Sequence, residues 1–169
     1  MKLIKTCLLA IVVLFTVASC SKDSDVNSDS EVNYTIDLDL TKKTDWDMAN
    51  EILILINDHR TSIGVDEILL DETYASAYAV GHTDYMIDTK QVNHDNFSER
   101  QAGLESRGAK AVGENVAYGY TTAEGVVSAW LNSPGHRQTI EEDYYTHTGF
   151  GIFQSEENRY YFTQIFYKE

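Results

Sequence analysis

The residues of this chain with the clearest chemical potential are three histidines and one glutamate: His82, His94, His136 and Glu114. Neutral imidazole nitrogens and a carboxylate can bind a divalent ion such as zinc. Histidine can also transfer a proton or bind a polar group near neutral pH. A single histidine often does no more than hydrogen-bond a backbone carbonyl. Spacing alone leaves all three interpretations open.

Motifs for nucleophilic catalysis are missing from the sequence. It contains no G-x-S-x-G elbow, no H-E-x-x-H pair and no P-loop. Its cysteines are Cys7 and Cys20, both near the N-terminus. The expected mature domain therefore has no thiol for a disulfide, for cysteine catalysis or for a cysteine-based zinc site, and its stability has to come from its core.

Two of the four ionisable residues lie in one stretch, residues 113–137, whose pattern indicates regular elements. Thr121 and Glu124 have the spacing of a capping box, and Pro134 suits the first turn of another helix that carries His136. Between them, apolar residues recur at helical spacing: Ala123, Val126, Val127, Trp130 and Leu131. We predict that Trp130 belongs to the core.

The elements that must position the remaining residues are predicted in chain order. A helix from a Thr44 cap to about Ser62 precedes a second helix that Asp71 caps and that carries His82 on its apolar stripe. A polar loop over residues 89–111 contains His94 and a short helix near residues 97–104. A strand over residues 112–118 carries Glu114, and residues 148–154 and 160–167 form a hairpin whose second strand is central.

Helices followed by strands in one domain indicate an α+β fold, with helices packed on a mainly antiparallel sheet.

The N-terminal region has a pattern that indicates targeting and not folding. Residues 1–19 have the charged and apolar segments of a signal peptide, and residues 17–20 read as a lipobox that ends at the lipidation site Cys20. The apolar run is shorter than the roughly 20 residues of a membrane span. Residues 20–43 are polar and acidic, which predicts a flexible tether, and residues 44–169 form the domain.

The charge of the chain limits its partners. The formal net charge is −14, and removal of residues 1–19 would take away Lys2 and Lys5 and leave −16. Such a chain repels phosphate backbones, so we expect no nucleic-acid partner. Attachment to a membrane should rest on the lipid at Cys20, at the outer membrane or the cell surface of a bacterium.

Six segments of the sequence resemble the CAP superfamily (cysteine-rich secretory proteins, antigen 5 and pathogenesis-related proteins), in its bacterial SCP-like branch. They are residues 53–86, 93–100 (NHDNFSER), 113–119 (GENVAYG), 126–140 (VVSAWLNSPGHRQTI), 148–153 (TGFGIF) and 160–167 (YYFTQIFY). The resemblance implies a three-layer α-β-α sandwich with an open cleft lined by a His/Glu tetrad.

The resemblance also assigns roles by position. His94 and Glu114 match two members of the tetrad, whereas Ser133 and Tyr161 stand where other members have the remaining two. His136 matches the bacterial SPGHR motif and is inferred to fill the same cleft. His82 matches a histidine typical of the bacterial branch. Because two ligand positions are replaced, zinc in the His/Glu cleft is a hypothesis, with candidate ligands His94, Glu114 and His136.

Two functions remain in competition at this point. The first is a non-enzymatic binding module that recognises an extracellular lipid, peptide or cell-envelope glycan through residues His82, His94, Glu114, Asn115, His136 and Tyr161. The alternative is a hydrolase of peptidase type, with His94 or His136 as general base and Glu114 either orienting it or activating water. The sequence gives no oligomerisation signal, and we expect a monomer.

Overall fold

A computed structural model of the chain describes residues 34–169. The predicted signal peptide, the lipidation site Cys20 and most of the predicted tether lie outside the described residues.

The described part contains five α-helices and one short 3₁₀ helix, η1. Their bounds are η1 Leu38–Lys43, α1 Trp46–Ser62, α2 Tyr74–Thr89, α3 Phe97–Glu105, α4 Ala123–Asn132 and α5 Pro134–Glu141. The predicted helices are thus present, and Pro134 opens α5 as expected. In the helix before it, Trp130 is 1% exposed, which confirms its place in the core.

Four strands form one sheet: β1 Leu69–Leu70, β2 Ala111–Tyr118, β3 His147–Gln154 and β4 Tyr160–Lys168. The strand order is β1-β3-β4-β2. Strand β1 pairs parallel to β3, and the other two pairings are antiparallel. The predicted hairpin is present, and β4 lies inside the sheet as expected. Strand β2, which carries Glu114, forms an edge.

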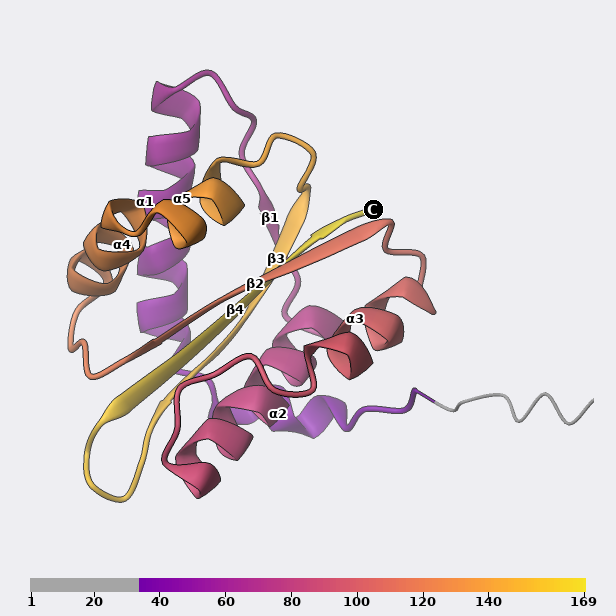
Figure 1. Cartoon of the computed structure of the whole chain (residues 1–169), viewed down its shortest axis with the longest axis vertical. Helices are drawn as coiled ribbons and strands as arrows, with labels where there is room; N and C mark the ends of the chain where they lie inside the picture. Colours follow the sequence, from indigo (N-terminus) through magenta and orange to yellow (C-terminus); the bar gives the residue numbers. More distant parts are fainter. Residues whose placement is uncertain (1–33) are drawn as a thin grey trace, which may run out of the picture. The chain divides into compact units, whose positions relative to one another are not determined.

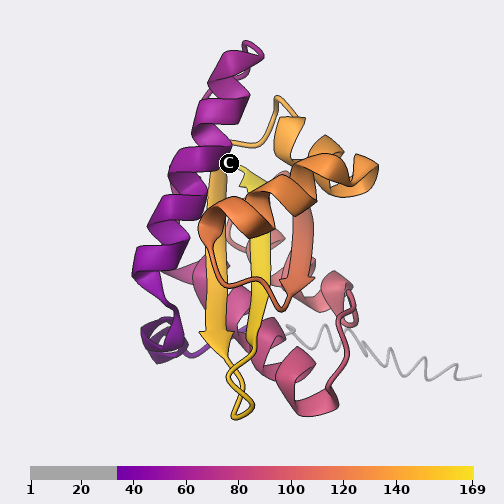
Figure 2. The ribbon, with the colours of Figure 1, turned by 90° about the vertical axis from the view of Figure 1, so that its left-hand side faces the viewer.

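The sheet lies between two helical layers (Figure 1). Helices α1, α4 and α5 form one layer, which faces the viewer in Figure 2. Helices α2 and α3, with η1 against α2, form the other. This arrangement confirms the expected α-β-α sandwich, and it places helices from opposite layers on the two sides of the β2 edge.

The two faces of the sheet are packed differently. Large apolar side chains fill the space toward α1 and α4, among them Ile52, Ile56, Val126, Trp130, Phe150, Phe162 and Phe166. On the other face, α2 lies so close to β3 that a Cβ atom on Gly149 or Gly151 would come within 3.0 Å of the α2 backbone. Only glycine permits this approach, which places α2 directly on the sheet.

Two predicted helix caps are wrong by one residue. Asp45, not Thr44, caps α1, because its Oδ1 accepts a hydrogen bond from the Met48 N–H at 3.1 Å. The Thr44 hydroxyl instead donates to the carbonyl of Phe150 at 3.1 Å. Likewise Thr122, not Thr121, caps α4. The Asp71 carboxylate does bind the start of α2, where it accepts from the N–H of Ala75 at 3.0 Å.

The folded domain begins earlier than residue 44. The segment before η1 contacts the helical layer of α2 and α3, and the Tyr34 carbonyl accepts hydrogen bonds from Tyr78 Oη at 3.1 Å and from Arg107 Nη2 at 2.8 Å. Ile36 packs against the apolar cluster that contains Tyr78. Residues 34–43 are therefore part of the domain, because Tyr34 and Ile36 both contact the layer of α2 and α3.

Candidate functional site

The centre of the site is a buried ion pair between Glu114 on β2 and Arg100 on α3. Arg100 Nε donates to Glu114 Oε2 at 2.8 Å, and Arg100 Nη2 donates to Oε1 at 2.9 Å. The two side chains are 8% and 2% exposed. Burial by itself would raise the pKa of Glu114, but hydrogen bonds from His94 and Arg100 outweigh it and hold that pKa below its ordinary value. Glu114 is thus kept ionised inside the protein.

Arg100 was not among the residues predicted for the site. It lies within the NHDNFSER segment, yet an arginine on a short polar helix is normally exposed. The sequence could have indicated Arg100 only in combination with Glu114. A buried carboxylate requires a cationic partner, and arginine can bind a carboxylate through two hydrogen bonds. Arg100 also donates to the Asp95 carbonyl at 2.7 Å, which ties the loop before α3 to the same pair.

His94 is the exposed member of the cluster. Its Nδ1 lies 2.8 Å from Glu114 Oε1, and its side chain is 50% exposed. Because a carboxylate can only accept, Nδ1 carries the hydrogen. In the neutral ring the Nε2 atom is then left with its lone pair. The sequence placed His94 and Glu114 together, and the structure brings them into direct contact.

His82 belongs to the same cluster, but it is enclosed. Its side chain is 1% exposed, and its Nε2 is 3.8 Å from Glu114 Oε1, too far for a hydrogen bond. Instead Nε2 donates to the Asn93 carbonyl at 2.8 Å. Burial, followed by the charge of Arg100, lowers the pKa of His82 below its ordinary value. His82 is therefore neutral and holds the loop that carries His94.

His136 approaches from the other layer. Successive side chains of a strand point to opposite faces, so Asn115 faces away from Glu114, and its Nδ2 donates to the His136 carbonyl on α5 at 3.1 Å. Burial lowers the pKa of His136, and the charge of His94 lowers it further. The two imidazoles are therefore within electrostatic reach of each other, one on each side of the β2 edge.

Tyr161 lies farther along the sheet. It pairs with Tyr118, whereas Glu114 pairs with Ile165, four residues away on β4 and roughly 13 Å by strand rise. Tyr161 packs with Met86 and Val116. A role for Tyr161 in the ligand cleft stays a prediction, because none of the hydrogen bonds described for residues 34–169 joins it to His94 or Glu114.

Zinc does not fit the donors as they are arranged. Both oxygens of Glu114 accept hydrogen bonds from Arg100, and the guanidinium occupies the space beside the carboxylate. The Nε2 of His82 is committed to a carbonyl. Among residues 34–169, no group of three potential ligands has the geometry to hold a metal ion. His94 Nε2 alone is not a zinc site, since structural and catalytic zinc sites have three or four protein ligands.

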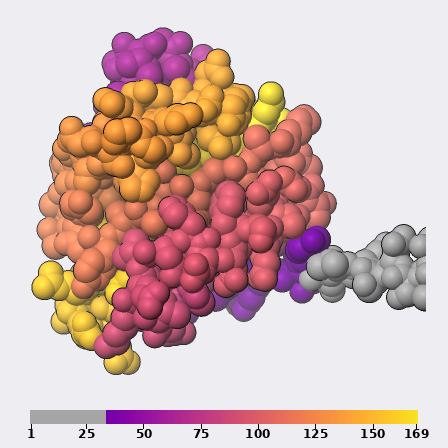
Figure 3. Space-filling model, viewed as in Figure 1, coloured from indigo at the N-terminus to yellow at the C-terminus, as the bar shows by residue number. Residues whose placement is uncertain are grey.

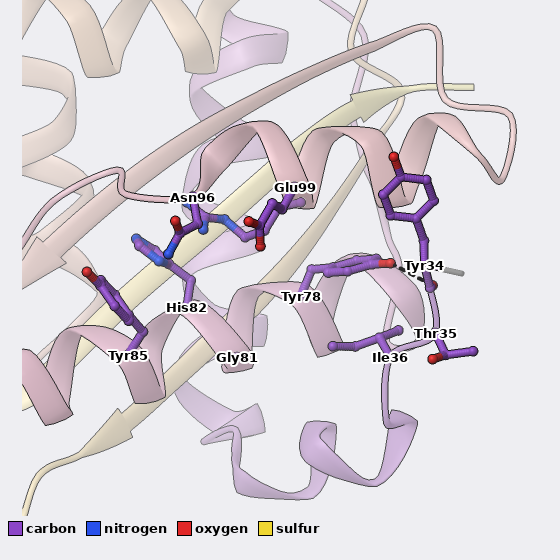
Figure 4. A pocket seen from close by; sticks show the side chains of 10 residues that line it. Tyr34, Thr35, Ile36, Tyr78, Gly81, His82, Tyr85, Asn96 and Glu99 are labelled. Atoms are coloured by element: carbon purple, nitrogen blue, oxygen red, sulfur yellow. Dashed lines mark hydrogen bonds between the residues drawn. The ribbon is translucent and has the colours of Figure 1, made fainter. Parts of the chain in front are cut away.

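A cavity of about 400 Å³ lies next to Arg100 of the ion pair. It lies between α2 and α3 (Figure 4). His82, Asn96 and Glu99 line one end, and Tyr78, Ile36 and Tyr34 line the other. Arg100 and His82 belong to both the cavity and the Glu114 cluster. In the space-filling view, the surface of β2 (salmon) lies between α4 and α5 (orange) and α3 with its preceding loop (red) (Figure 3).

The fold and this site define a class of protein. Residues 53–166 match the family model "CAP: Cysteine-rich secretory protein family". The chain belongs to the CAP family. It is 32% identical over 133 residues to the uncharacterized membrane protein YlbC of Bacillus subtilis, covering 75% of this chain and 36% of that protein. It is 33% identical over 109 residues to the uncharacterized protein YkwD of the same organism, covering 62% and 42%. The chain thus spans less than half the length of these relatives.

Solved structures support the same fold. An outer surface protein of Borrelia burgdorferi superposes with a TM-score of 0.66 at 19% identity, covering 73% of this chain and 93% of that one. An extracellular protein containing a SCP domain from Bacillus anthracis gives a TM-score of 0.59 at 26% identity, covering 75% and 44%. Both superpositions support a CAP fold for this chain. Within residues 34–169, no helix is both long and apolar enough to span a bilayer.

Proposed function

We propose that this CAP domain is a non-enzymatic recognition module tethered to the bacterial cell envelope, and that its ligand binds at the open edge of β2 beside His94. One observation carries the proposal. The Glu114–Arg100 pair is almost fully buried, yet it holds an imidazole that is 50% exposed. A buried ion pair that fixes one exposed hydrogen-bonding group is a preorganised contact for a ligand.

One specific feature favours the hydrolase hypothesis, namely the hydrogen bond from His94 Nδ1 to Glu114. A carboxylate in this position orients an imidazole, as catalytic dyads do. A hydrolase of this kind would use His94 Nε2 to activate water. Recognition is the better-supported role because Glu114 accepts two hydrogen bonds from Arg100 beside the one from His94, so its charge is already balanced by a guanidinium.

The anchoring part of the proposal rests on Cys20 and on the relatives. The lipobox ends at Cys20, and similar proteins are described as a membrane protein, an outer surface protein and an extracellular protein. A lipid on Cys20 would tether a monomeric domain through the acidic segment. Metabolic labelling with a radioactive fatty acid should mark the wild-type chain and leave Cys20→Ser unlabelled. Labelling of Cys20→Ser would contradict the anchor.

Recognition is tested with the chain lacking residues 1–19 and carrying Cys20→Ser. Calorimetric titration would probe three ligand sets: vesicles of envelope phospholipids, soluble peptidoglycan fragments and short peptides. His94→Gln should weaken binding about tenfold or more, since it removes a preorganised contact. His59→Gln is the matched control, because His59 also pairs with a glutamate but does so at Glu141, outside the cluster. Equal affinity in both variants would contradict the proposal. Turnover of a peptide or ester that disappears only in His94→Gln would favour the hydrolase.

A further inference from the structure

The backbone of β2 carries hydrogen-bonding groups that its neighbour β4 does not use. In an antiparallel pair, residues alternate between pairs that exchange N–H···O=C bonds and pairs that do not. The Gly119 N–H bonds the Tyr160 carbonyl at 2.9 Å, and the register runs on unbroken from Tyr118 with Tyr161 to Ala111 with Lys168. Gly113, Asn115 and Ala117 therefore bond to β4. Val112, Glu114 and Val116 direct their N–H and C=O groups to the open edge.

An independent contact confirms this alternation. The Trp130 indole Nε1 donates to the Val116 carbonyl at 3.1 Å, which requires that carbonyl to point away from β4. Trp130 also closes the edge at this point. On the Glu114 side of Trp130, the open part of the edge is the window from Val112 to Glu114, whose outward groups have no hydrogen-bond partner among residues 34–169.

The window is accessible to solvent. Glu114 as a whole is half-buried, whereas its side chain is only 2% exposed, so most of its accessible surface belongs to the backbone. Val112 and Gly113 are half-buried as well. The next three residues, Asn115 to Ala117, are buried. Within residues 112–117, exposure is thus confined to Val112, Gly113 and Glu114.

We propose that this window binds an extended peptide, which adds a short strand to β2. The inference rests on the proposed recognition function and names the ligand class for it. Outward groups on Val112 and Glu114, two residues apart, are spaced roughly 7 Å along the edge, which is the repeat that an added strand requires. Strand addition of this kind derives affinity from backbone bonds and specificity from alternate side chains.

The side chains that flank the window, His94 and His136, suggest how such a peptide would be recognised. The peptide residue opposite Glu114 would direct its side chain to the face where His94 lies, because paired residues on neighbouring strands share a face. Its two neighbours in the peptide would point to the opposite face, where α5 presents His136. The chain carries a net charge of −14, so peptides with lysine or arginine near their ends should associate fastest.

A second copy of this chain fits the window less well than a peptide. Pairing of two β2 strands would need a longer open edge, but Trp130 covers the Val116 carbonyl, and α3 and α5 lie against β2 on its two faces. A free extended segment of roughly four to six residues meets neither obstacle. It needs to pair only with the outward N–H and C=O groups of Val112 and Glu114, with one further residue on each side.

The test uses the Cys20→Ser chain lacking residues 1–19 and a hexapeptide library on an array. Binding of the chain to each hexapeptide is measured at low salt. The tightest hexapeptide is then made in versions that are each N-methylated at one position, so that each lacks one backbone donor. Strand addition predicts that affinity falls about tenfold at alternate positions and stays nearly unchanged at the positions between them, because only every second N–H faces β2. The methylated neighbours are thus matched controls within one peptide.

Amide hydrogen exchange gives a second readout. The amides of Val112 and Glu114 should become protected when the hexapeptide binds, whereas those of Gly113 and Asn115, bonded to β4, should already be protected. Binding without an alternating methylation pattern, or without new protection at Glu114, would overturn strand addition but leave recognition intact. Failure of every hexapeptide would also overturn it, and the lipid and glycan titrations would then decide the recognition function separately. Protection at Glu114 that grows with protein concentration alone would assign the edge to a second copy.

Discussion

Arg100 and Glu114 meet across two layers of the fold, one from α3 and one from β2, in two hydrogen bonds of 2.8 and 2.9 Å. The state of Glu114, the position of His94 and the loop before α3 all depend on this pair. It keeps Glu114 ionised, gives His94 a fixed acceptor and joins the loop at Asp95 to the helix that follows.

Removal of Arg100 should therefore destabilise the domain strongly. Arg100→Met leaves a buried carboxylate without a counter-charge, and such losses amount to about 3–5 kcal/mol of unfolding free energy. Urea denaturation at neutral pH measures the effect. The double variant Arg100→Met/Glu114→Gln should recover part of it, because the buried charge is then gone.

A matched control for that prediction is Lys90→Met. Lys90 pairs with Glu157 at 2.8 Å, but the side chains are 74% and 66% exposed. Solvent screens such a pair, so the change should lie close to the error of the measurement. If Arg100→Met behaved like Lys90→Met, the central role of the buried pair would be wrong.

The stability of the domain should fall in acid in two steps. The pKa of His82 is lowered by burial from its ordinary value of 6.5, so the unfolded chain binds a proton first, and stability is lost as the pH falls below about 6.5. The pKa of Glu114 is lowered from 4.5 despite its burial, so its contribution is present above 4.5 and is lost as the pH falls further. Thermal melting from about pH 8 down to about pH 3 would measure both steps.

His82→Gln separates the first step from the second. A glutamine amide can still donate to the Asn93 carbonyl, but it does not titrate. The slope of melting temperature against pH just below 6.5 should therefore become smaller in this variant, with His136, whose pKa is also lowered, accounting for what remains. An unchanged slope would show that His82 is not the group responsible.

Much of the fold was predictable because its signals are local. The apolar stripe of α2 has helical spacing, and the strands of the β3–β4 hairpin are rich in aromatic and β-branched residues, so each pattern is set by burial of one face of its own element. Helix caps were less predictable. Thr44 and Asp45 are neighbours that both suit a cap, and the choice between them depends on the Phe150 carbonyl, which binds the Thr44 hydroxyl from a distant part of the chain.

The candidate site was predictable only in part for the same reason. His94 and Glu114 were found from their place in a family pattern, and the structure brings them into contact. Arg100 was missed because its partner is 14 residues away on a different element. The outward direction of the Glu114 N–H and C=O groups follows from the register of β2 against β4. The residue pattern of β2 alone does not contain that register.

Two glycines should respond to alanine in opposite ways. Gly81 lies within α2, and a Cβ atom there would have no neighbour within 4 Å. Gly81→Ala should stabilise the domain by about 1 kcal/mol, because alanine favours a helix over glycine. Gly151→Ala should destabilise it by about 3 kcal/mol, because its Cβ would strike the backbone of Ala79 and Val80. Urea denaturation of both variants is the measurement. No loss of stability in Gly151→Ala would contradict the close packing of α2 on β3, and a loss in Gly81→Ala would contradict the open space around Gly81.

The final prediction concerns the hydrogens on two imidazoles of the site. His82 donates through Nε2 to a carbonyl, and His94 donates through Nδ1 to a carboxylate, so the two rings should be opposite tautomers when both are neutral. Nitrogen chemical shifts from long-range proton–nitrogen NMR spectra distinguish them.

Glu114→Gln provides the internal comparison for these spectra. A glutamine side chain accepts through one oxygen only, so the preference of His94 for hydrogen on Nδ1 should weaken, whereas His82 should keep hydrogen on Nε2 because the Asn93 carbonyl is unchanged. The result bears directly on recognition. With Nδ1 fixed as the donor, His94 Nε2 can accept a hydrogen bond from a ligand at the β2 edge. Finding hydrogen on Nε2 of His94 in the wild type would reverse that polarity, and the ligand would then have to supply an acceptor.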